Sequence, residues 1–285
     1  MAGNALFCFG LGYSAGFLAR DLAQEGWRIA GTSREAPAGM APFPRRRFDR
    51  AHPLADARGM LAGTTHLLVS IPPDEAGCPV CDRHGAEVAA IAGLRWIGYL
   101  SSTNVYGDRG GDWVDEATPS APSGERGRRR VAAESAWLAL GARSGVPVQI
   151  FRLAGIYGPG RNALDTLRAG TARRIVKPGQ VFSRIHVDDL VAVVRASMAR
   201  PHAGAIYNVC DDAPAPPDDV IAYAAALLDM TPPRLEDYAS AALSPMARSF
   251  YDESKRVSNR RLKEALGVTL RYPSYREGLA ALLTP

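Results

Sequence analysis

The sequence predicts an α/β protein built on a doubly wound parallel β-sheet, with a smaller lobe toward the C-terminus. Short, uninterrupted apolar runs recur along the first half of the chain, as expected for strands that are buried on both faces. Segments with the apolar spacing of helices separate these runs, and a glycine-rich turn joins the first run to the first helical segment. Strands that alternate with helices form parallel sheets, because each crossover returns the chain to the same edge.

The composition agrees with a globular chain that has one large core. Of the 285 residues, 47% are hydrophobic and 22% are charged, which is ordinary usage for soluble proteins. This length suits one large domain, or one domain with a smaller lobe. The net charge of +5 favours anionic ligands in a general way.

The first apolar run, residues 5–9, is followed by the turn Gly10-Leu-Gly12-Tyr-Ser-Ala15 and a helical segment. In this G-x-G-x-x-G/A pattern the first glycine permits a tight turn, and the second lets the backbone approach a pyrophosphate. The small third residue lets the helix pack close to the strand, with its N-terminus facing the phosphates. This context favours a Rossmann-like dinucleotide site over an ordinary glycine-rich turn. The predicted cofactor-binding residues are Gly10, Gly12, Tyr13, Ser14 and Ala15.

The second strand, residues 27–31, leads into Thr32, Ser33 and Arg34. An acidic residue at this place binds the ribose of NAD, whereas an arginine accommodates the 2′-phosphate of NADP. Ser33 and Arg34 therefore predict NADP, and the adjacent Glu35 keeps NAD open. The alternative interpretation of Arg34 is a solvated charge in a turn.

Two further strands are expected to carry a polar side chain to the cofactor. Residues 45–49 form a short third strand that ends in Asp49. Its three arginines fit a solvated sheet edge better than a nucleic-acid patch. Residues 64–71 form a buried fourth strand that stops at two prolines, so Ser70 borders the cofactor. His66 in this strand fits a packed histidine better than a ligand.

A helix around residues 86–92 leads to the fifth strand, residues 96–100. Sites in doubly wound sheets lie at the carboxyl ends of strands, and the hydroxyls of Ser101, Ser102 and Thr103 stand at such an end. After a polar loop, a helix opens with four arginines in five positions, namely Arg126, Arg128, Arg129 and Arg130.

The second half of the chain continues the alternation. Further strands are predicted at 146–153, 184–187 and 205–210, and further helices at 190–198, 217–228 and over the last part of the chain. Asp188 is a suitable N-cap for the first of these helices. Ser258 and Ser274 can cap the two C-terminal helices, and Gly267 can end the first of them.

From the fifth strand onward the motifs resemble those of one family. Ser101-Ser-Thr-Asn-Val-Tyr-Gly107 is followed by Asp115-Glu-Ala-Thr-Pro119 and by a helix with Glu134. Later matching stretches are 151–161, 184–190, 207–209 and 258–262. Together, in this order, they resemble the extended short-chain dehydrogenases/reductases of the NAD-dependent epimerase/dehydratase family, over nearly the whole chain.

The resemblance implies a Ser or Thr that binds the reacting oxygen, matched by Ser102, and a Tyr followed four residues later by a Lys. The helix aligns through Gly127 and Glu134, so Arg126 stands at the Tyr position and Arg130 at the Lys position. Residues four apart lie on one helix face. Arg130 can still bond a ribose. Arg126 cannot supply a proton, because a guanidinium stays protonated, but it could stabilise an oxyanion.

A reaction at this site would therefore need a different acid. Tyr106 and Tyr13 are candidates by position, and the alternative for Tyr106 is a packed aromatic side chain that borders the site. The predicted catalytic residues are Ser102, Tyr106, Arg126 and Arg130, and Arg130 is also assigned to the cofactor.

Two functions remain open. The first is an NAD(P)-dependent oxidoreductase or epimerase that acts on a small carbonyl/alcohol or a nucleotide-sugar-like substrate. The second is a catalytically inactive NADP-binding sensor or regulatory protein, which Arg126 favours. The chain is expected to be a single NAD(P)-binding Rossmann-type domain, 1–285, with a substrate lobe formed mainly by residues 155–180 and 205–285. The family further implies a homodimer.

Neither nucleic acid nor a membrane is an expected partner. The arginine runs match no nucleic-acid-binding module, and the predicted partner is a small-molecule substrate. Residues 5–19 are apolar but lack a basic leader and are broken by glycines, so we expect no secretion signal. No apolar run is long enough to span a bilayer, and we expect a cytoplasmic protein.

Four cysteines do not make a disulfide framework in a chain of this length. Cys78-Pro-Val-Cys81, followed by His84, could supply metal ligands or a redox pair. Because no second pair with zinc spacing is present in the sequence, a plain surface loop is favoured and no metal is predicted.

Overall fold

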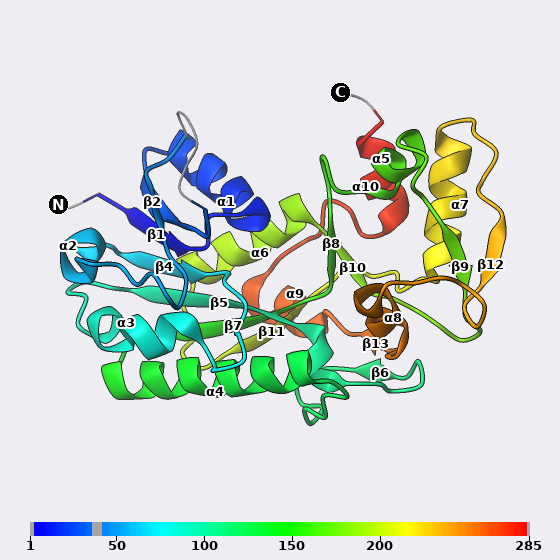
Figure 1. Ribbon diagram of the computed structural model, residues 1–285. Coiled ribbons are helices and arrows are strands. Elements are labelled where there is room, and N and C mark those ends of the chain that lie inside the picture. Colours follow the sequence, from blue (N-terminus) through cyan, green and yellow to red (C-terminus); the bar gives the residue numbers. More distant parts are fainter. Residues whose placement is uncertain (1–2, 36–41, 284–285) are drawn as a thin grey trace. The chain divides into compact units, whose positions relative to one another are not determined.

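The computed structural model describes residues 3–35 and 42–283 and contains a seven-stranded sheet (Figure 1). Its strands are β1 (Ala5–Phe9), β2 (Arg28–Ser33), β3 (Arg45–Arg47), β4 (His66–Val69), β5 (Trp96–Ser102), β7 (Val148–Leu153) and β11 (Ile206–Val209). They lie in the order β11-β7-β5-β4-β1-β2-β3, so the chain starts in the middle and winds outward in both directions. The pairs from β3 through β5 are parallel. The predicted doubly wound α/β fold is confirmed.

Helices cover both faces of this sheet. In Figure 1, α1 (Tyr13–Gln24) and α6 (Val187–Ala199) lie on one face, and α3 (Pro79–Ala89) and α4 (Glu125–Ser144) lie on the other. The short helix α2 (Ala57–Leu61) packs against α3. Every residue of β1 and β4 is buried, which is why these strands are continuous apolar runs rather than alternating ones.

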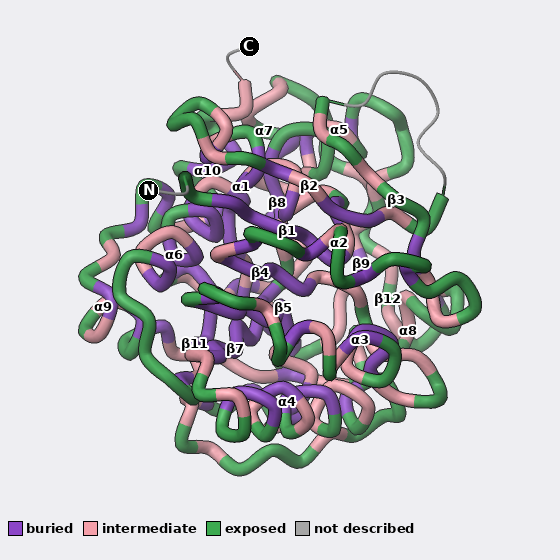
Figure 2. The backbone as a smooth tube through the Cα atoms, turned by 90° about the vertical axis from the view of Figure 1, so that its left-hand side faces the viewer, coloured by how far each residue is buried: buried purple, intermediate pink, exposed green. Residues whose placement is uncertain are grey.

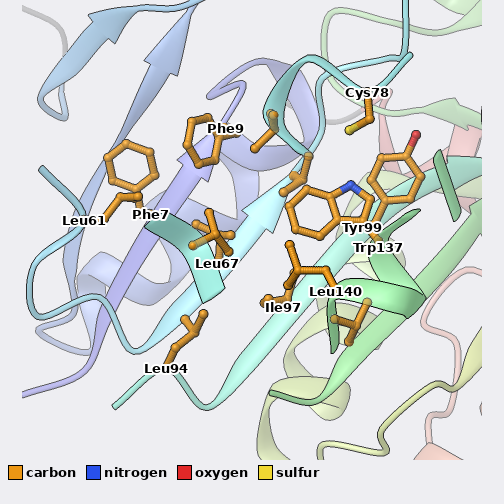
Figure 3. Close-up of a cluster of buried hydrophobic side chains, with 14 of the residues drawn as sticks. Phe7, Phe9, Leu61, Leu67, Cys78, Leu94, Ile97, Tyr99, Trp137 and Leu140 are labelled. Carbon is orange, nitrogen blue, oxygen red and sulfur yellow. The ribbon is translucent and has the colours of Figure 1, made fainter. Parts of the chain in front are cut away.

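The main core lies between the sheet and helices α3 and α4. Trp137 of α4 stacks on Tyr99 of β5 with ring centroids 6.3 Å apart, and Ile97, Leu140 and Cys78 belong to the same cluster (Figure 3). Figure 2 shows the buried residues concentrated along the strands of the sheet. This packing fixes the strand ends on which the cofactor loop and Ser102 stand.

The chain divides into two compact units. Unit 1 comprises Met1–Ser102, Glu125–Arg152 and Val191–Tyr207, and it holds most of the sheet. Unit 2 comprises Thr103–Gly124, Leu153–Leu190 and Asn208–Pro285.

Unit 2 is built from short parallel strand pairs and short helices. The pairs are β8 (Gly155–Tyr157) with β10 (Arg184–His186), β9 (Arg174–Val176) with β12 (Leu235–Asp237), and β6 (Trp113–Val114) with β13 (Arg256–Val257). The helices are the 3-10 turn η1 (Thr103–Tyr106), α5 (Ala163–Arg168), α7 (Pro217–Leu227), α8 (Pro245–Tyr251), α9 (Arg260–Leu266) and α10 (Tyr275–Ala281). Buried side chains of α5, α7 and α10 form a second core.

Helix α3 begins earlier than predicted. Cys78 is its N-cap and Pro79 its first residue, so Cys78 and Cys81 lie at a helix start rather than in a surface loop. The physical reason is Pro79, because proline is well suited to the first helical position, where its missing N–H is not needed.

The predicted caps are partly correct. Ser274 caps α10 and accepts a hydrogen bond from the N–H of Arg276, and Gly267 ends α9 in the left-handed region with φ 67°. The N-cap of α9 is Asn259 rather than Ser258. Asp188 is not an N-cap, because α6 already begins at Val187 and Asp188 lies in its first turn.

Candidate functional site

The glycine turn after β1 is held by direct contact with the end of β4. Gly10 has φ 92°, and a Cβ placed on it would come within 2.5 Å of Ser70 Oγ. The Ser70 hydroxyl donates a hydrogen bond to the carbonyl of Gly10. On the other side, the N–H of Gly10 donates to Thr32 Oγ1 at 2.9 Å. Only glycine fits at position 10, for both conformational and steric reasons.

The turn leads directly into the N-terminus of α1. Gly12 is the N-cap of this helix, and a Cβ placed on it would have no atom within 4 Å. Ala15 is buried against the sheet, whereas Tyr13 and Ser14 are half-buried. The backbone at Gly12 is therefore open to a close neighbour, at a helix end whose N–H groups attract anions. These are the properties that a pyrophosphate site requires.

The end of β2 carries Ser33 and the exposed Arg34. Ser33 Oγ donates to the carbonyl of Glu35 at 2.6 Å, which closes a local turn. Asp49 follows β3, and its carboxylate accepts hydrogen bonds from the backbone N–H groups of Ala51 and His52. A hydrogen bond from the His52 side chain is the largest cause that lowers the pKa of Asp49. The Asp49 carboxylate therefore stabilises the turn that follows β3. Its assignment to the cofactor stays a prediction.

The end of β5 is anchored by a buried polar network. Ser101 Oγ donates to Glu134 of α4, and Glu134 pairs with Arg152 of β7 at 2.8 Å. All three side chains are buried. The next residue, Ser102, is half-buried at the carboxyl end of the strand. In the sequence, Glu134 was recognisable only as a residue that aligns the helix, and its support of the strand that carries Ser102 was not predicted.

Arg130 lies against the same strand end. Its Nη1 donates to Tyr99 Oη at 3.1 Å and to the carbonyl oxygen of Leu100 at 2.8 Å. Arg126 is exposed one turn earlier in α4, with the buried Gly127 directly after it. The structure thus places Arg130 against the strand end that carries Ser102, and Nη1 of Arg130 makes both of these hydrogen bonds.

Of the remaining arginines of the α4 run, Arg128 is exposed and Arg129 is half-buried. Arg128 and Arg129 both pair with Glu125 in the same helix turn. Such exposed pairs fit a solvated helix face.

Tyr106 is placed in the interior of unit 2. Its side chain is fully buried, and its hydroxyl donates to Asn208 Oδ1 at 2.7 Å. Its phenol proton is already committed to a structural bond. This arrangement favours the packed-aromatic interpretation over the proton-donor one.

His66 has structural surroundings, as predicted, and so has His186. His66 is buried in β4, contacts Trp27 with ring centroids 4.8 Å apart, and burial lowers its pKa to about 4. His186 is buried beside Tyr272, and its Nδ1 accepts from the N–H of Asp188. Burial also lowers the pKa of His186. Both rings are therefore neutral packing elements at neutral pH.

Cys78, Cys81 and His84 were the candidate metal ligands of the sequence. His84 Nε2 accepts from the N–H of Leu54 at 3.0 Å, so this ring nitrogen is engaged elsewhere. Over residues 3–35 and 42–283, no group of three or more His, Cys, Asp or Glu side chains is arranged to hold a metal ion.

Unit 2 contains a pocket of about 310 Å³ that sequence reasoning did not locate. Its lining combines apolar side chains of α5, α7 and α10 with aromatic, cationic, amide and hydroxyl groups, among them Tyr157, Asn162, Thr166, Arg173, Arg184 and Tyr275. Arg184 donates through Nη1 to the carbonyls of Phe182 and Ala215, and Arg173 pairs with Glu236. Asn162 of the lining is the N-cap of α5. The pocket walls come from α5, α7 and α10, which lie far apart in the sequence.

Residues 84–210 match the model of the NAD dependent epimerase/dehydratase family. The chain is 28% identical over 280 residues to protein YeeZ of Escherichia coli (strain K12), with 93% of this chain and 94% of that protein covered. It is 30% identical over 214 residues to a 3-diazoavenalumate denitrifying reductase of a Streptomyces species, with 69% of this chain and 67% of that protein covered.

Solved structures share the whole fold. A functionally unknown conserved protein from Silicibacter pomeroyi DSS is 53% identical, with a TM-score of 0.90 and 98% of each chain covered. MoeE5 in complex with UDP-glucuronic acid and NAD is 20% identical, with a TM-score of 0.80 and 98% of this chain and 97% of that chain covered. At that identity the second likeness concerns the fold alone. Within the described part of the chain, no helix is long and apolar enough to cross a membrane.

Proposed function

We propose that this chain, which belongs to the NAD-dependent epimerase/dehydratase family of the extended short-chain dehydrogenases/reductases, is an NAD(P)-dependent oxidoreductase or epimerase. Its substrate would be a small carbonyl/alcohol or a nucleotide-sugar-like compound. The observation that carries the proposal is the turn at Gly10 and Gly12. One glycine is required by packing against Ser70, and the other leaves the backbone open at the N-terminus of α1.

The cofactor would be held by unit 1. The pyrophosphate would lie on the N–H groups of the turn from Gly10 to Ala15, and Ser70 would border it. Arg130 would bond the nicotinamide ribose from the strand end where it already contacts Leu100. The exposed Arg34 supports NADP, because its guanidinium can pair with a 2′-phosphate. When bound, the cofactor supplies the hydride acceptor or donor.

Ser102 and Arg126 would act on the reacting oxygen. The Ser102 hydroxyl can donate a hydrogen bond to it, and Arg126 can stabilise negative charge that develops on it. Arg126 keeps its own proton, so proton transfer would use another group. The Tyr106 hydroxyl is committed to Asn208, which counts against its service as that group.

The pocket of unit 2 supports an anionic, ring-containing substrate. Arg184 contributes positive charge, Arg173 contributes a guanidinium that is paired with Glu236, and Tyr157 and Tyr275 contribute aromatic surface. A nucleoside diphosphate would use both features. MoeE5, which shares the fold, was solved with UDP-glucuronic acid, and this supports testing UDP-sugars first. Homodimerisation, which the family implies, is part of the same proposal.

A second candidate function is a cofactor-binding protein without turnover, and Arg126 favours it. A guanidinium at the place of the family's Tyr cannot exchange a proton at neutral pH. Such a protein would bind NAD(P)(H) through the same glycine turn and signal its occupancy to a partner.

The deciding experiment combines binding and turnover. NADPH and NADH are titrated by fluorescence, and cofactor oxidation is then followed over aldehydes, ketones and nucleotide sugars. Tight binding with turnover of at least one substrate is the expected result. Tight binding with no turnover would support the sensor function, and the absence of binding for both cofactors would overturn both candidates.

A further inference from the structure

Cys78 and Cys81 stand one helical turn apart at the start of α3, in unit 1. Cys78 is the N-cap and Pro79 the first helical residue, which makes Cys81 the third. The N–H of Asp82 donates to the carbonyl of Cys78 at 2.9 Å, which closes the first turn around the pair. Side chains at the N-cap and the third helical position face each other in this geometry. Both cysteines are free thiols.

The surroundings give the two thiols different protonation. A hydrogen bond from the Cys81 side chain is the largest cause that lowers the pKa of Cys78 to about 7. The same contact, together with burial, raises the pKa of Cys81. The other two cysteines, Cys8 and Cys210, are fully buried, and burial raises the pKa of each. At the N-cap, Cys78 is also hydrogen-bonded by the backbone of Cys81 and Val80, which lowers its pKa further, so Cys78 is the thiol of the pair that ionises first.

Access to the pair comes from the side of Cys81. Cys78 is only 4% exposed, whereas Cys81 is half-buried. A small oxidant such as hydrogen peroxide is therefore a better probe of the pair than a bulky one. A low-pKa thiolate with a neighbouring thiol is the arrangement that peroxide oxidises selectively.

We propose that Cys78 and Cys81 form a redox-modification site, at which hydrogen peroxide produces an intramolecular disulfide. The Cys78 thiolate attacks one peroxide oxygen, the O–O bond breaks, and Cys78 becomes a sulfenic acid while hydroxide leaves and takes up a proton. The Cys81 sulfur then attacks the Cys78 sulfur, the S–O bond breaks, and water leaves with the Cys81 proton. Two thiols and one peroxide give one disulfide and two waters, and added thiols reverse the change by exchange.

The site adjoins the candidate active centre through Tyr99. Cys78 lies beside Tyr99 and Trp137 (Figure 3). The hydroxyl of Tyr99 accepts from Arg130. Burial raises the pKa of Tyr99, and the charge of Cys78 adds to this effect. Disulfide formation removes the negative charge of Cys78 beside Tyr99, whose hydroxyl accepts the hydrogen bond from Arg130. The disulfide itself does not depend on the proposed function.

The test uses the full-length wild-type protein and hydrogen peroxide. Trypsin releases residues 59–83 as one peptide that contains Cys78 and Cys81 and neither of the other cysteines. After peroxide, its mass should fall by two hydrogens, and the number of thiols titrated after denaturation should fall from four to two. Dithiothreitol should restore both values.

Two variants separate the steps. In Cys81→Ser the disulfide should be absent and a sulfenic acid on Cys78 should be trapped by dimedone, whereas Cys78→Ser should give neither product. Cys210→Ala is the matched control and should keep the peptide's mass change. An unchanged wild-type peptide, or equal peroxide oxidation of Cys8 and Cys210 in the folded protein, would overturn the proposal without need of any variant.

Discussion

Glu134 and Arg152 form an ion pair in the interior of unit 1, with Nη2 of Arg152 2.8 Å from Oε2 of Glu134. Their side chains are 5% and 6% exposed, respectively. Because the carboxylate also accepts from Ser101 Oγ, the pair ties α4 and β7 to the strand end that carries Ser102. This support has direct consequences for stability.

Removal of the carboxylate should destabilise the protein strongly. Glu134→Ala leaves the buried Arg152 charge without its carboxylate partner and should lower the free energy of unfolding by about 3–5 kcal/mol, measured by urea denaturation. The control is Glu264→Ala, which removes an exposed pair with Arg260 at 3.7 Å and should cost less than about 1 kcal/mol. Equal effects of the two substitutions would contradict the structural role of Glu134.

The two glycines of the cofactor turn should respond differently to alanine. Gly10→Ala forces a Cβ against Ser70 Oγ at positive φ and should cost about 1–3 kcal/mol of stability along with cofactor binding. Gly12→Ala meets no protein atom within 4 Å, so the melting temperature should stay near wild type while NAD(P)H affinity falls. Thermal unfolding and fluorescence titration of both variants check this. Retained affinity in Gly12→Ala would argue against a pyrophosphate at this turn.

Arg34 should discriminate between the two cofactors. Loss of a charge-assisted bond to the 2′-phosphate costs roughly 1.5–3 kcal/mol, so Arg34→Ala should raise the NADPH dissociation constant about 10- to 100-fold. The NADH constant should not change. Arg58→Ala, another exposed arginine of unit 1, serves as the control. An unchanged NADPH constant in Arg34→Ala would show that Arg34 is a solvated turn charge.

His66 should make stability depend on pH. Burial lowers its pKa in the folded protein to about 4, below the unfolded value of about 6.5. The unfolded chain therefore binds more protons between these values, and the free energy of unfolding should fall as pH drops from 6.5 toward 4. For a single histidine the total effect is roughly 3 kcal/mol. His66→Gln should flatten this part of the curve of urea midpoint against pH, and a slope equal to wild type would refute the assignment.

Ser102 should matter for turnover and not for cofactor affinity. Loss of one hydrogen bond to a developing oxyanion costs about 10²–10³ in kcat, so Ser102→Ala should slow any substrate found in the panel by that order. NAD(P)H affinity should stay at the wild-type value. Ser135→Ala, an exposed serine of α4, should leave both quantities unchanged. A normal kcat in Ser102→Ala would remove Ser102 from the mechanism.

By itself the sequence determined the doubly wound sheet, the turn from Gly10 to Ala15 and the strand end at Ser102. These features depend on neighbouring residues, because strand patterning, glycine conformation and helix starts are local properties. The sequence also placed Arg126 and Arg130 on one helix face, by their spacing alone.

Only the tertiary structure decided which buried polar groups meet. Ser101 reaches Glu134 across 33 positions, and Tyr106 reaches Asn208 across 102. The pocket of unit 2 likewise needs α5, α7 and α10 together. An apolar pattern predicts that a segment is buried. The hydrogen-bond partner of a buried hydroxyl or carboxylate, however, depends on how distant elements pack. For that reason Tyr106 was a candidate acid from the sequence alone. In the structure, its buried hydroxyl donates a hydrogen bond to Asn208 instead.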